Sequence, residues 1–260
     1  MITRDAAHRY TDTETGKQYV SVTTALDVLD KSRPLMTWMG NQVASACVRM
    51  LPELPKMLET LGEEAVIKAL TSRGNFTRDT AAQLGTDVHA LADLVVRGQP
   101  TPPMDETRRA RVLHYAKWWE GELKAGAHLR LSEAMILTPD QDGTPETGWA
   151  GTFDLLYRDG DGATVLADIK TGGKWGRKVY ESEVLQVTAY GMGRFVQPAT
   201  DDLSVPPAIY PMPIPDKYKI IHVTGEGCKA IPVDVTQRER MAWLSCLDLY
   251  HWQQNLKRKT

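Results

Sequence analysis

Residues 151–170 read GTFDLLYRDGDGATVLADIK, two apolar runs on either side of a polar turn. The runs 151–158 and 164–170 predict two β-strands, and the four residues 159–162, Asp-Gly-Asp-Gly, predict the turn that joins them. Both runs are apolar at successive positions, which is typical of strands that are covered on both faces. We therefore expect an antiparallel hairpin at the centre of the fold.

The same hairpin carries acidic residues and a lysine in a pattern that indicates a metal site. A turn centred on Asp161 places Asp154 opposite Asp168, and cross-strand neighbours have Cβ atoms about 4.5–5.5 Å apart. Asp168 and Lys170 are two residues apart in a strand, so they point to one face. Two carboxylates this close repel each other unless a proton or a cation lies between them. Carboxylates, a backbone carbonyl such as that of Ile169, and waters are ligands for a hard divalent ion, above all Mg²⁺.

A simpler interpretation of these residues is that Asp154 is a surface acid and that Asp168 pairs with Lys170 in solvent. Exposed pairs of this kind are common and contribute little to stability. The apolar neighbours on both sides favour the metal site instead, because buried acids need partners. Lys170 is then placed to orient a water nucleophile or to stabilise charge on a transferred phosphoryl group.

The rest of the chain predicts helices and strands around this hairpin. Periodicity and capping residues predict helices over 77–96, 106–124 and 181–195, a strand over 129–137, a hairpin over 219–223 and 228–235, and a last helix from 236. Six prolines lie within 197–215, where we expect little regular structure. The fold class is therefore α/β or α+β. We expect an N-terminal strand and helical segment over 1–76, a core over 77–195 and a completing segment over 196–260.

Four further residues line up with the hairpin, each with an ordinary structural alternative. His89 lies on the predicted helix 77–96, where a lone histidine is more often structural than a ligand. Glu133 is an acid within an apolar strand and fits an edge position as well. Gln186 and Tyr190 are four residues apart and so share one face of a helix, which could simply be the edge of the core.

The order of these elements is more specific than any one of them. Gly85-x-x-x-His89, Glu133, Gly151-x-x-Asp154, Asp168-Ile169-Lys170 and Gln186-x-x-x-Tyr190 follow one another between residues 85 and 190. This series resembles the RecB-like branch of the PD-(D/E)XK nuclease superfamily, which includes phage-type exonucleases and CRISPR-associated adaptation nucleases. The resemblance implies a restriction-endonuclease-like core, a central mixed sheet flanked by helices, with an added N-terminal helical layer.

The resemblance also implies a role for each matching residue. It assigns Mg²⁺ or Mn²⁺ to His89, Asp154 and Asp168, and it makes Lys170 catalytic together with the two aspartates. Gln186 and Tyr190 then support DNA binding or the geometry of the site, and Glu133 takes the place of an acid near it. From their position after the Asp168–Lys170 strand, we expect Lys174, Arg177 and Lys178 to contact DNA phosphates.

The expected function is a metal-dependent exonuclease that hydrolyses phosphodiester bonds at DNA ends in recombination, repair or phage DNA metabolism. A structure-specific or restriction-like endonuclease of the same fold is an alternative. A non-catalytic DNA-binding subunit is a second one. DNA is the expected partner, no membrane is expected, and a second copy of the chain or a recombination protein as a further partner is left open.

The composition of the chain bears on the expected cofactor and cellular compartment. The chain has 260 residues, a formal charge of −2 and three cysteines, Cys47, Cys228 and Cys246. Some relatives hold an iron–sulfur cluster on four cysteines, so no such cluster is expected here. Few, scattered cysteines indicate a reducing compartment, the cytoplasm of a bacterial or phage-infected cell. The chain lacks the basic excess of many nucleic-acid-binding domains, but a bound cation would return positive charge to the site.

Overall fold

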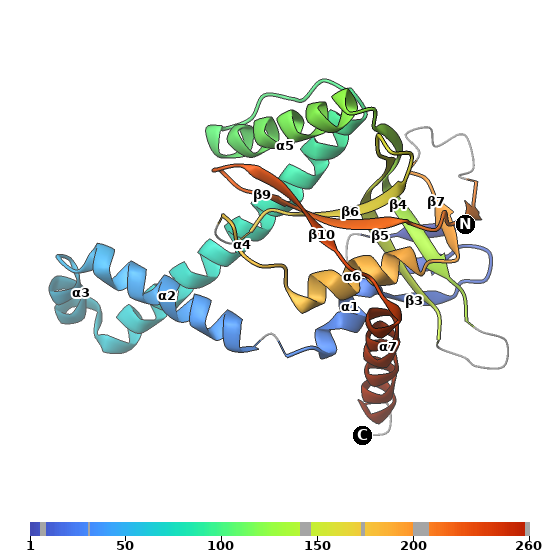
Figure 1. Cartoon of the computed structure of the whole chain (residues 1–260). Coiled ribbons are helices and arrows are strands. Elements are labelled where there is room, and N and C mark those ends of the chain that lie inside the picture. The colour runs from blue at the N-terminus through green and yellow to red at the C-terminus, as the bar shows by residue number, and fades with distance from the viewer. Residues whose placement is uncertain (6–8, 31, 141–146, 173–174, 200–207, 258–260) are drawn as a thin grey trace. The chain divides into compact units, whose positions relative to one another are not determined.

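The computed structural model describes residues 1–5, 9–30, 32–140, 147–172, 175–199 and 208–257 (Figure 1). The chain forms two compact units. The first, here called the sheet unit, comprises Met1–Leu29 and Val88–Thr260, and the second, the helical unit, comprises Asp30–Asp87. The sheet unit contains the strands, and the class of the fold is mixed α+β. The unit boundaries differ from the expected boundary at 76/77, because residues 18–21 pair with the central sheet.

The helices agree with the predicted ones in place and differ at some ends. They are α1 (Val22–Ala25), η1 (Leu26–Val28), α2 (Ser32–Met50), α3 (Leu54–Leu61), α4 (Glu63–Val96), α5 (Glu106–Lys124), α6 (Glu181–Gly191) and α7 (Gln237–Lys257). α4 begins well before the predicted start at 77, and α6 ends before the predicted 195. The last helix begins as its capping pattern predicts, since the backbone N–H of Thr236 donates to Glu239 Oε2 at 2.8 Å.

The strands form a single mixed sheet with a branched order. They are β1 (Ile2–Arg4), β2 (Tyr10–Asp12), β3 (Gln18–Ser21), β4 (His128–Thr138), β5 (Trp149–Arg158), β6 (Thr164–Lys170), β7 (Phe195–Gln197), β8 (Tyr210–Pro211), β9 (Lys217–Val223) and β10 (Cys228–Val233). β5 pairs antiparallel with β4 along its length, whereas β6 pairs antiparallel with β5 and parallel with β9. The hairpin predicted over 151–170 is thus confirmed as the centre of the sheet.

Helices cover both faces of this sheet. On one face, Phe153, Leu156 and Leu166 are buried against Leu185 of α6 and Trp243 of α7. The other face carries a second core, in which the sheet residues Leu155, Tyr157 and Val165 pack with Val96 of α4 and Trp119 of α5. α5 and α6 accordingly lie on opposite sides of the strands in Figure 1. Burial on both faces explains why these strands are apolar at successive positions.

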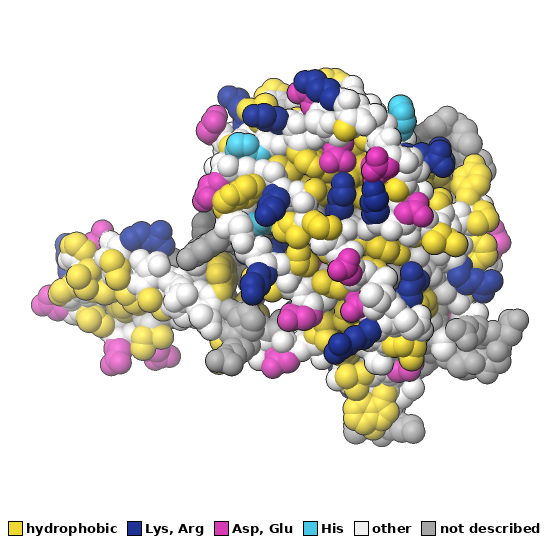
Figure 2. Space-filling view, in the orientation of Figure 1, with side chains coloured by type: hydrophobic (Ala, Val, Ile, Leu, Met, Phe, Trp, Pro, Cys, Tyr) yellow, Lys and Arg dark blue, Asp and Glu magenta, His cyan; other side chains and the backbone are white. Residues whose placement is uncertain are grey.

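The helical unit has a small core of its own. Ala46 and Met50 of α2 are buried against Val66 and Leu70 of α4. Pro52 lies between α2 and α3, and Pro55 lies in the first turn of α3, where a missing N–H is tolerated. Among the described residues, no helix combines the length and apolar character that crossing a membrane requires. The face of the molecule in Figure 2 shows basic and acidic side chains interspersed across the sheet unit.

Candidate metal centre

The candidate site lies where the central strand β5 changes its partner. β3 pairs with β5 at Trp149 and Ala150, and β6 pairs with it from Leu155 onward. The predicted register of the hairpin is confirmed, because Leu155 lies opposite Ala167. The ladder stops there, so Asp154 and Asp168 follow immediately after the last paired residues rather than within the ladder. The carboxylates of both residues are nearly buried there, at 9% exposure for the Asp154 side chain and 3% for that of Asp168.

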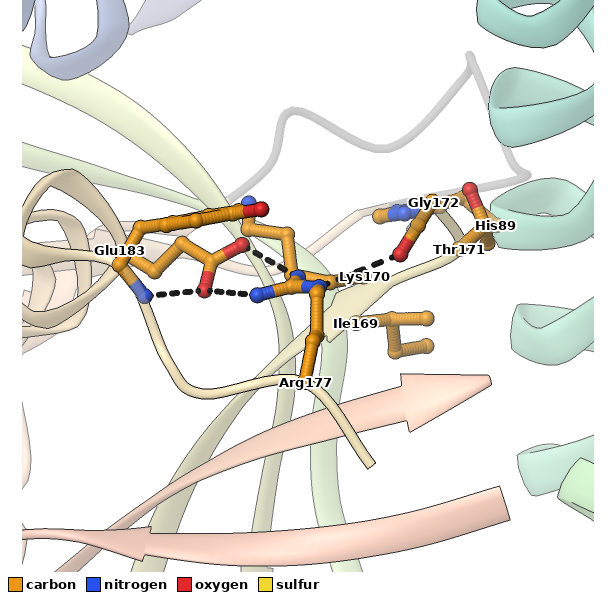
Figure 3. Close-up of a pocket in the computed structure, with 8 residues that line it drawn as sticks. His89, Ile169, Lys170, Thr171, Gly172, Arg177 and Glu183 are labelled. Carbon is orange, nitrogen blue, oxygen red and sulfur yellow. Dashed lines mark hydrogen bonds and ion pairs between the residues drawn. The ribbon is translucent and has the colours of Figure 1, made fainter. Parts of the chain in front are cut away.

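A pocket of about 380 Å³ opens beside this point (Figure 3). It is lined by His89, Ile169, Lys170, Thr171, Gly172, Arg177, Tyr180 and Glu183. These residues come from α4, the end of β6, the loop that follows β6 and the first turn of α6. The pocket is therefore lined by two of the predicted metal-ligand residues, His89 and Ile169, and by the predicted catalytic lysine, Lys170.

The loop between β6 and α6 is closed by an internal ion pair. The guanidinium of Arg177 donates to both oxygens of Glu183, at 2.6 and 2.9 Å, and to the carbonyls of Gly172 and Lys178. Both side chains of the pair are about nine-tenths buried, at 11% and 9% exposure. Arg177 is therefore engaged within the protein, although the sequence predicts that it contacts DNA. Lys178 is exposed, and Lys174 lies outside the described residues.

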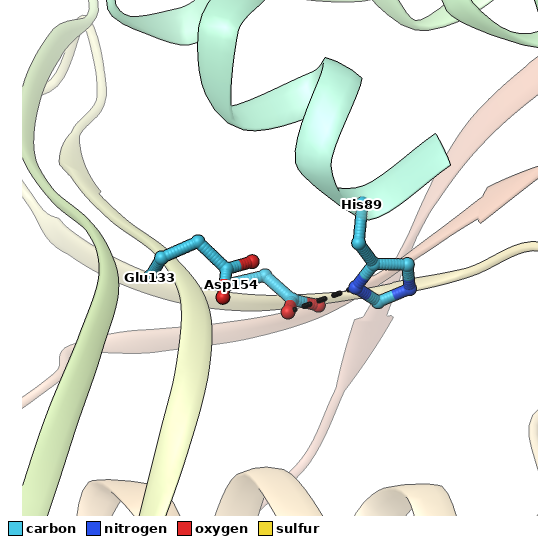
Figure 4. A group of neighbouring side chains, drawn as sticks. All are labelled: His89, Glu133 and Asp154. Carbon is cyan, nitrogen blue, oxygen red and sulfur yellow. Dashed lines mark hydrogen bonds and ion pairs between the residues drawn. The ribbon is translucent and has the colours of Figure 1, made fainter. Parts of the chain in front are cut away.

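Three side chains converge from α4, β4 and β5 (Figure 4). His89, Glu133 and Asp154 each offer one ligand atom, and these atoms all lie within 4.8 Å of one another. His89 Nδ1 lies 3.1 Å from Asp154 Oδ1. The sequence assigns His89 and Asp154 to the metal and leaves Glu133 with a less defined place. In the structure Glu133 is a full member of this compact group, which we call the triad.

Glu133 occupies its place through an unusual backbone conformation. Its φ is 47°, in the left-handed region that a glutamate rarely adopts. Ser132 pairs with Leu155 and Ala134 with Phe153, so Glu133 lies opposite Asp154. Strict alternation of faces also fails here, since Leu155 belongs to one core and Phe153, two residues earlier, to the other. Backbone strain of this kind gathers at functional sites.

Asp168 and Lys170 adjoin the triad and are tied to α6. Lys170 Nζ lies 2.7 Å from Asp168 Oδ2 in an ion pair and donates to Gln186 Oε1 at 2.9 Å. Gln186 Nε2 in turn donates to Asp168 Oδ1 at 3.2 Å and to the Tyr190 hydroxyl at 2.8 Å. The predicted set Asp168, Lys170, Gln186 and Tyr190 is thus brought together in one network. Gly151 permits this packing, because a Cβ there would lie 2.7 Å from Tyr190 Cε1.

Ile169 connects the two parts of the site through its backbone. Its N–H donates to Asp154 Oδ2 at 2.5 Å, and its side chain is buried in the core beneath α5. The amide thus holds the Asp154 carboxylate against the end of β6. The expected contribution of the Ile169 carbonyl to a metal stays a prediction.

The electrostatics of the site are those of a crowded acidic centre. Burial raises the pKa of Asp168 to about 6 despite the neighbouring charge of Lys170. Burial and the charge of Asp154 raise the pKa of Glu133 to about 8. Burial would lower the pKa of His89, but the charge of Asp154 and their hydrogen bond raise it to about 9. The pKa of Asp154 is lowered instead, because the positive charges of His89 and Lys170 outweigh the effect of burial.

These residues fit a divalent cation. Asp168 Oδ2 is buried, and the ammonium of Lys170 lies 2.7 Å from it. The carboxylates of Glu133, Asp154 and Asp168 repel one another when ionised, and burial together with the charge of Asp154 raises the pKa values of Glu133 and Asp168. Carboxylate oxygens and an imidazole nitrogen are both ligands for divalent cations in proteins. His89, Glu133 and Asp154 are therefore the residues that could hold such an ion, and Asp168 as a ligand stays a prediction.

Sequence reasoning did not identify the residues that support this centre. Arg97, the residue directly after α4, donates to the Ser132 side chain at 3.0 Å and to Asp93 at 2.9 Å. The spacing of His89, Asp93 and Arg97, four residues each, places them on one helix face and was the available signal. No sequence pattern predicts a structural role for Glu183, because its contact with Arg177 depends on the three-dimensional path of the loop.

Comparisons with known proteins add little to this geometry. No protein-family profile matches the sequence, and no curated protein matches it. Among solved structures, the chain is similar to one described as "Crystal structure of SSO0001", with 14% sequence identity and a TM-score of 0.36. The similarity covers 57% of this chain and 60% of that chain. A likeness at this level carries no inference about fold family or activity.

Proposed function

We propose that this protein is a Mg²⁺- or Mn²⁺-dependent deoxyribonuclease with a restriction-endonuclease-like core. The observation that carries the proposal is the convergence of His89, Glu133 and Asp154 within 4.8 Å, next to the Asp168–Lys170 pair. The order of these residues along the chain, which resembles RecB-like nucleases, supports the same activity. The central mixed sheet with helices on both faces agrees with that fold but is also found elsewhere.

Some residues of the site would bind the ion, and others position those ligands. The triad and Asp168 would hold the ion, which when bound supplies charge stabilisation to the phosphate and lowers the pKa of a water. Asp154 is positioned by the imidazole of His89 and by the Ile169 amide. Asp168 is positioned by the Gln186 amide. These hydrogen bonds fix the carboxylates before substrate arrives, which is the condition for electrostatic preorganisation.

Lys170 serves as a cation in this arrangement and not as a base. Burial would lower its pKa, but the charges of Asp168 and Asp154 raise it above the ordinary value. The ammonium is therefore protonated at neutral pH. It lines the pocket, so it is placed to contact a phosphate oxygen of the substrate and to stabilise the charge that develops there.

We further propose that the enzyme acts at DNA ends as an exonuclease, as the resemblance implies. The experiment compares end-labelled linear DNA with covalently closed circular DNA in Mg²⁺, using wild type and Lys170→Met. We expect wild type to shorten linear DNA and to leave closed circles intact, and Lys170→Met to do neither. Nicking of circles at the rate of shortening would instead favour the endonuclease. Binding without any cleavage would favour a non-catalytic DNA-binding subunit.

A further inference from the structure

We propose that Trp175 is a stacking platform for an unpaired nucleobase, so that the preferred substrate is DNA with a single-stranded end. The inference rests on the proposed function and names a substrate class for it. Trp175 lies in the loop between β6 and α6, five residues after Lys170. It is one of the exposed large apolar side chains, at 40% exposure.

The Trp175 ring is held in place from the side of the sheet. It stacks on the imidazole of His222, with ring centroids 6.3 Å apart and ring planes 17° apart. His222 is 1% exposed and belongs to β9, so this support is part of the core. Gly227 completes the support, because a Cβ there would lie 2.7 Å from the indole ring. An exposed ring with a fixed orientation can stack on a ligand with little loss of conformational entropy.

The same contacts connect Trp175 to the pocket of the candidate metal centre. His222 Nε2 lies 2.8 Å from the carbonyl oxygen of Gly172, which lines the pocket together with Lys170. The exposed Lys178 follows on the same loop. A phosphate near Lys170 would therefore place the adjoining nucleotide close to an aromatic surface.

An unpaired base is the ligand that this arrangement suits. Stacking on an aromatic side chain needs access to the flat face of a base, and that face is covered by neighbours within a duplex. The exposed Tyr180 is a weaker candidate on the same loop, because the Arg177 guanidinium lies over its ring at 4.6 Å. Trp175 combines exposure with a support, His222, that contacts the pocket residue Gly172.

The test measures binding of short labelled DNA by fluorescence anisotropy in Ca²⁺, so that cleavage does not interfere. The probes are a single strand, the same strand with abasic positions near the end, and a blunt duplex. The proteins are wild type, Trp175→Ala, Trp175→Phe and the control Trp252→Ala, since Trp252 is also exposed, at 59%, but lies on α7. The abasic strand keeps the phosphates and lacks the bases, so it isolates stacking.

We expect Trp175→Ala to bind the single strand about tenfold more weakly than wild type, with partial recovery in Trp175→Phe. Wild type should discriminate against the abasic strand by a similar factor, and Trp175→Ala should not. Equal binding of normal and abasic strands by wild type would overturn the stacking site, while Mg²⁺-dependent cleavage would leave the proposed function standing. Absence of both DNA binding and cleavage in wild type would overturn both.

A second inference rests on a different observation, the left-handed backbone of Glu133. We infer that Arg97 is a positioning residue for this glutamate, also within the proposed function. Arg97 Nε lies 3.0 Å from Ser132 Oγ, and Nη2 donates to the Ser132 carbonyl at 3.4 Å. That carbonyl belongs to the peptide that precedes Glu133, so Arg97 fixes the plane about which the φ of 47° is set. Asp93 orients the guanidinium in turn, at 2.9 Å.

The test measures the dissociation constant for Mn²⁺ by calorimetry, together with the melting temperature of the metal-free protein. We expect Arg97→Met to bind Mn²⁺ at least about tenfold more weakly, as is typical when a group that orients a ligand is lost. Arg97→Lys should recover part of the affinity, and Arg109→Met, an exposed control on α5, should match wild type. Unchanged Mn²⁺ affinity in folded Arg97→Met would overturn the positioning role. Wild type that binds no Mn²⁺ would overturn the metal centre as well.

Discussion

His89 Nδ1 and Asp154 Oδ1 lie 3.1 Å apart and join α4 to β5 across 65 residues of sequence. The contact fixes one ligand on a helix and another on the central strand, so the geometry of the centre depends on how α4 packs on the sheet. It also holds a proton that a cation must displace. Both consequences can be measured.

Metal affinity should rise with pH. The pKa of His89 is about 9 and that of Glu133 about 8 in the metal-free protein, so both hold a proton at pH 7. Because a cation binds the deprotonated ligands, each displaced proton should tighten binding by about tenfold per pH unit below the pKa of its group. Calorimetric titration with Mn²⁺ between about pH 6.5 and 8.5, in buffers of different ionisation enthalpy, measures the proton release. His89→Ala should release fewer protons, and an unchanged release would remove His89 from the ligand set.

Glu133→Gln should stabilise the metal-free protein at alkaline pH. The pKa of Glu133 is about 8 in the folded protein and 4.5 ordinarily, so the folded state holds the proton more tightly between these values. The resulting stabilisation is fully present below pH 4.5 and is lost as pH rises through about 8. Glutamine cannot ionise, so the variant should melt a few degrees above wild type at about pH 8.5, a gain of order 1–3 kcal/mol, and near wild type at about pH 4. A lower melting temperature at both pH values would contradict the assignment.

The Arg177–Glu183 pair should stabilise the loop that carries Trp175. Removal of one partner leaves the other nearly buried and uncompensated, which costs about 3–5 kcal/mol in comparable pairs. We therefore expect the losses of unfolding free energy in Glu183→Ala and Arg177→Ala to add up to more than the loss in the double variant. Chemical denaturation of the three variants and wild type gives the coupling free energy. A coupling near zero would mean that the pair is dispensable.

Gly151 and Gly121 should respond to alanine in opposite ways. A Cβ at Gly151 would lie 2.7 Å from Tyr190 Cε1 and 3.1 Å from Val22 Cγ2, so Gly151→Ala should destabilise the fold by about 1–3 kcal/mol. A Cβ at Gly121, within α5, meets nothing within 4 Å, so Gly121→Ala should stabilise by about 0.5–1 kcal/mol. Denaturant titrations measure both values. Equal effects would mean that Tyr190 does not pack tightly on Gly151.

The hairpin over 151–170 could be predicted from sequence because its determinants are local. Turn residues at 159–162 and apolar runs on either side set the register, and Leu155 lies opposite Ala167 as that register requires. The same register predicts that Asp154 and Asp168 lie near each other. It does not predict that the β5–β6 ladder stops there while β6 goes on pairing with the distant β9 as far as Lys170.

The composition of the triad could be predicted only in part. The resemblance to RecB-like nucleases predicts His89 as a ligand, whereas its own helix does not. No spacing within a helix indicates a partner 65 residues away. The position of Glu133 could not be predicted, because a left-handed glutamate contradicts local propensity and the preceding peptide is contacted by Arg97 from a distant part of the chain. Arg177 was expected at the DNA because a basic residue after an active-site strand is typical of phosphate contacts. Its partner Glu183 lies on α6, which closes the loop in three dimensions.

The most direct test of the metal centre is the affinity of Mn²⁺ for Asp154→Asn, compared with wild type and Asp161→Asn. Asp161 lies in the turn at the opposite end of the same hairpin and serves as a matched control. We predict that wild type and Asp161→Asn bind Mn²⁺ equally and that Asp154→Asn binds it at least about 100-fold more weakly, since a direct ligand is lost. Binding of Mn²⁺ by Asp154→Asn with wild-type affinity would contradict the metal centre and, with it, the proposed nuclease.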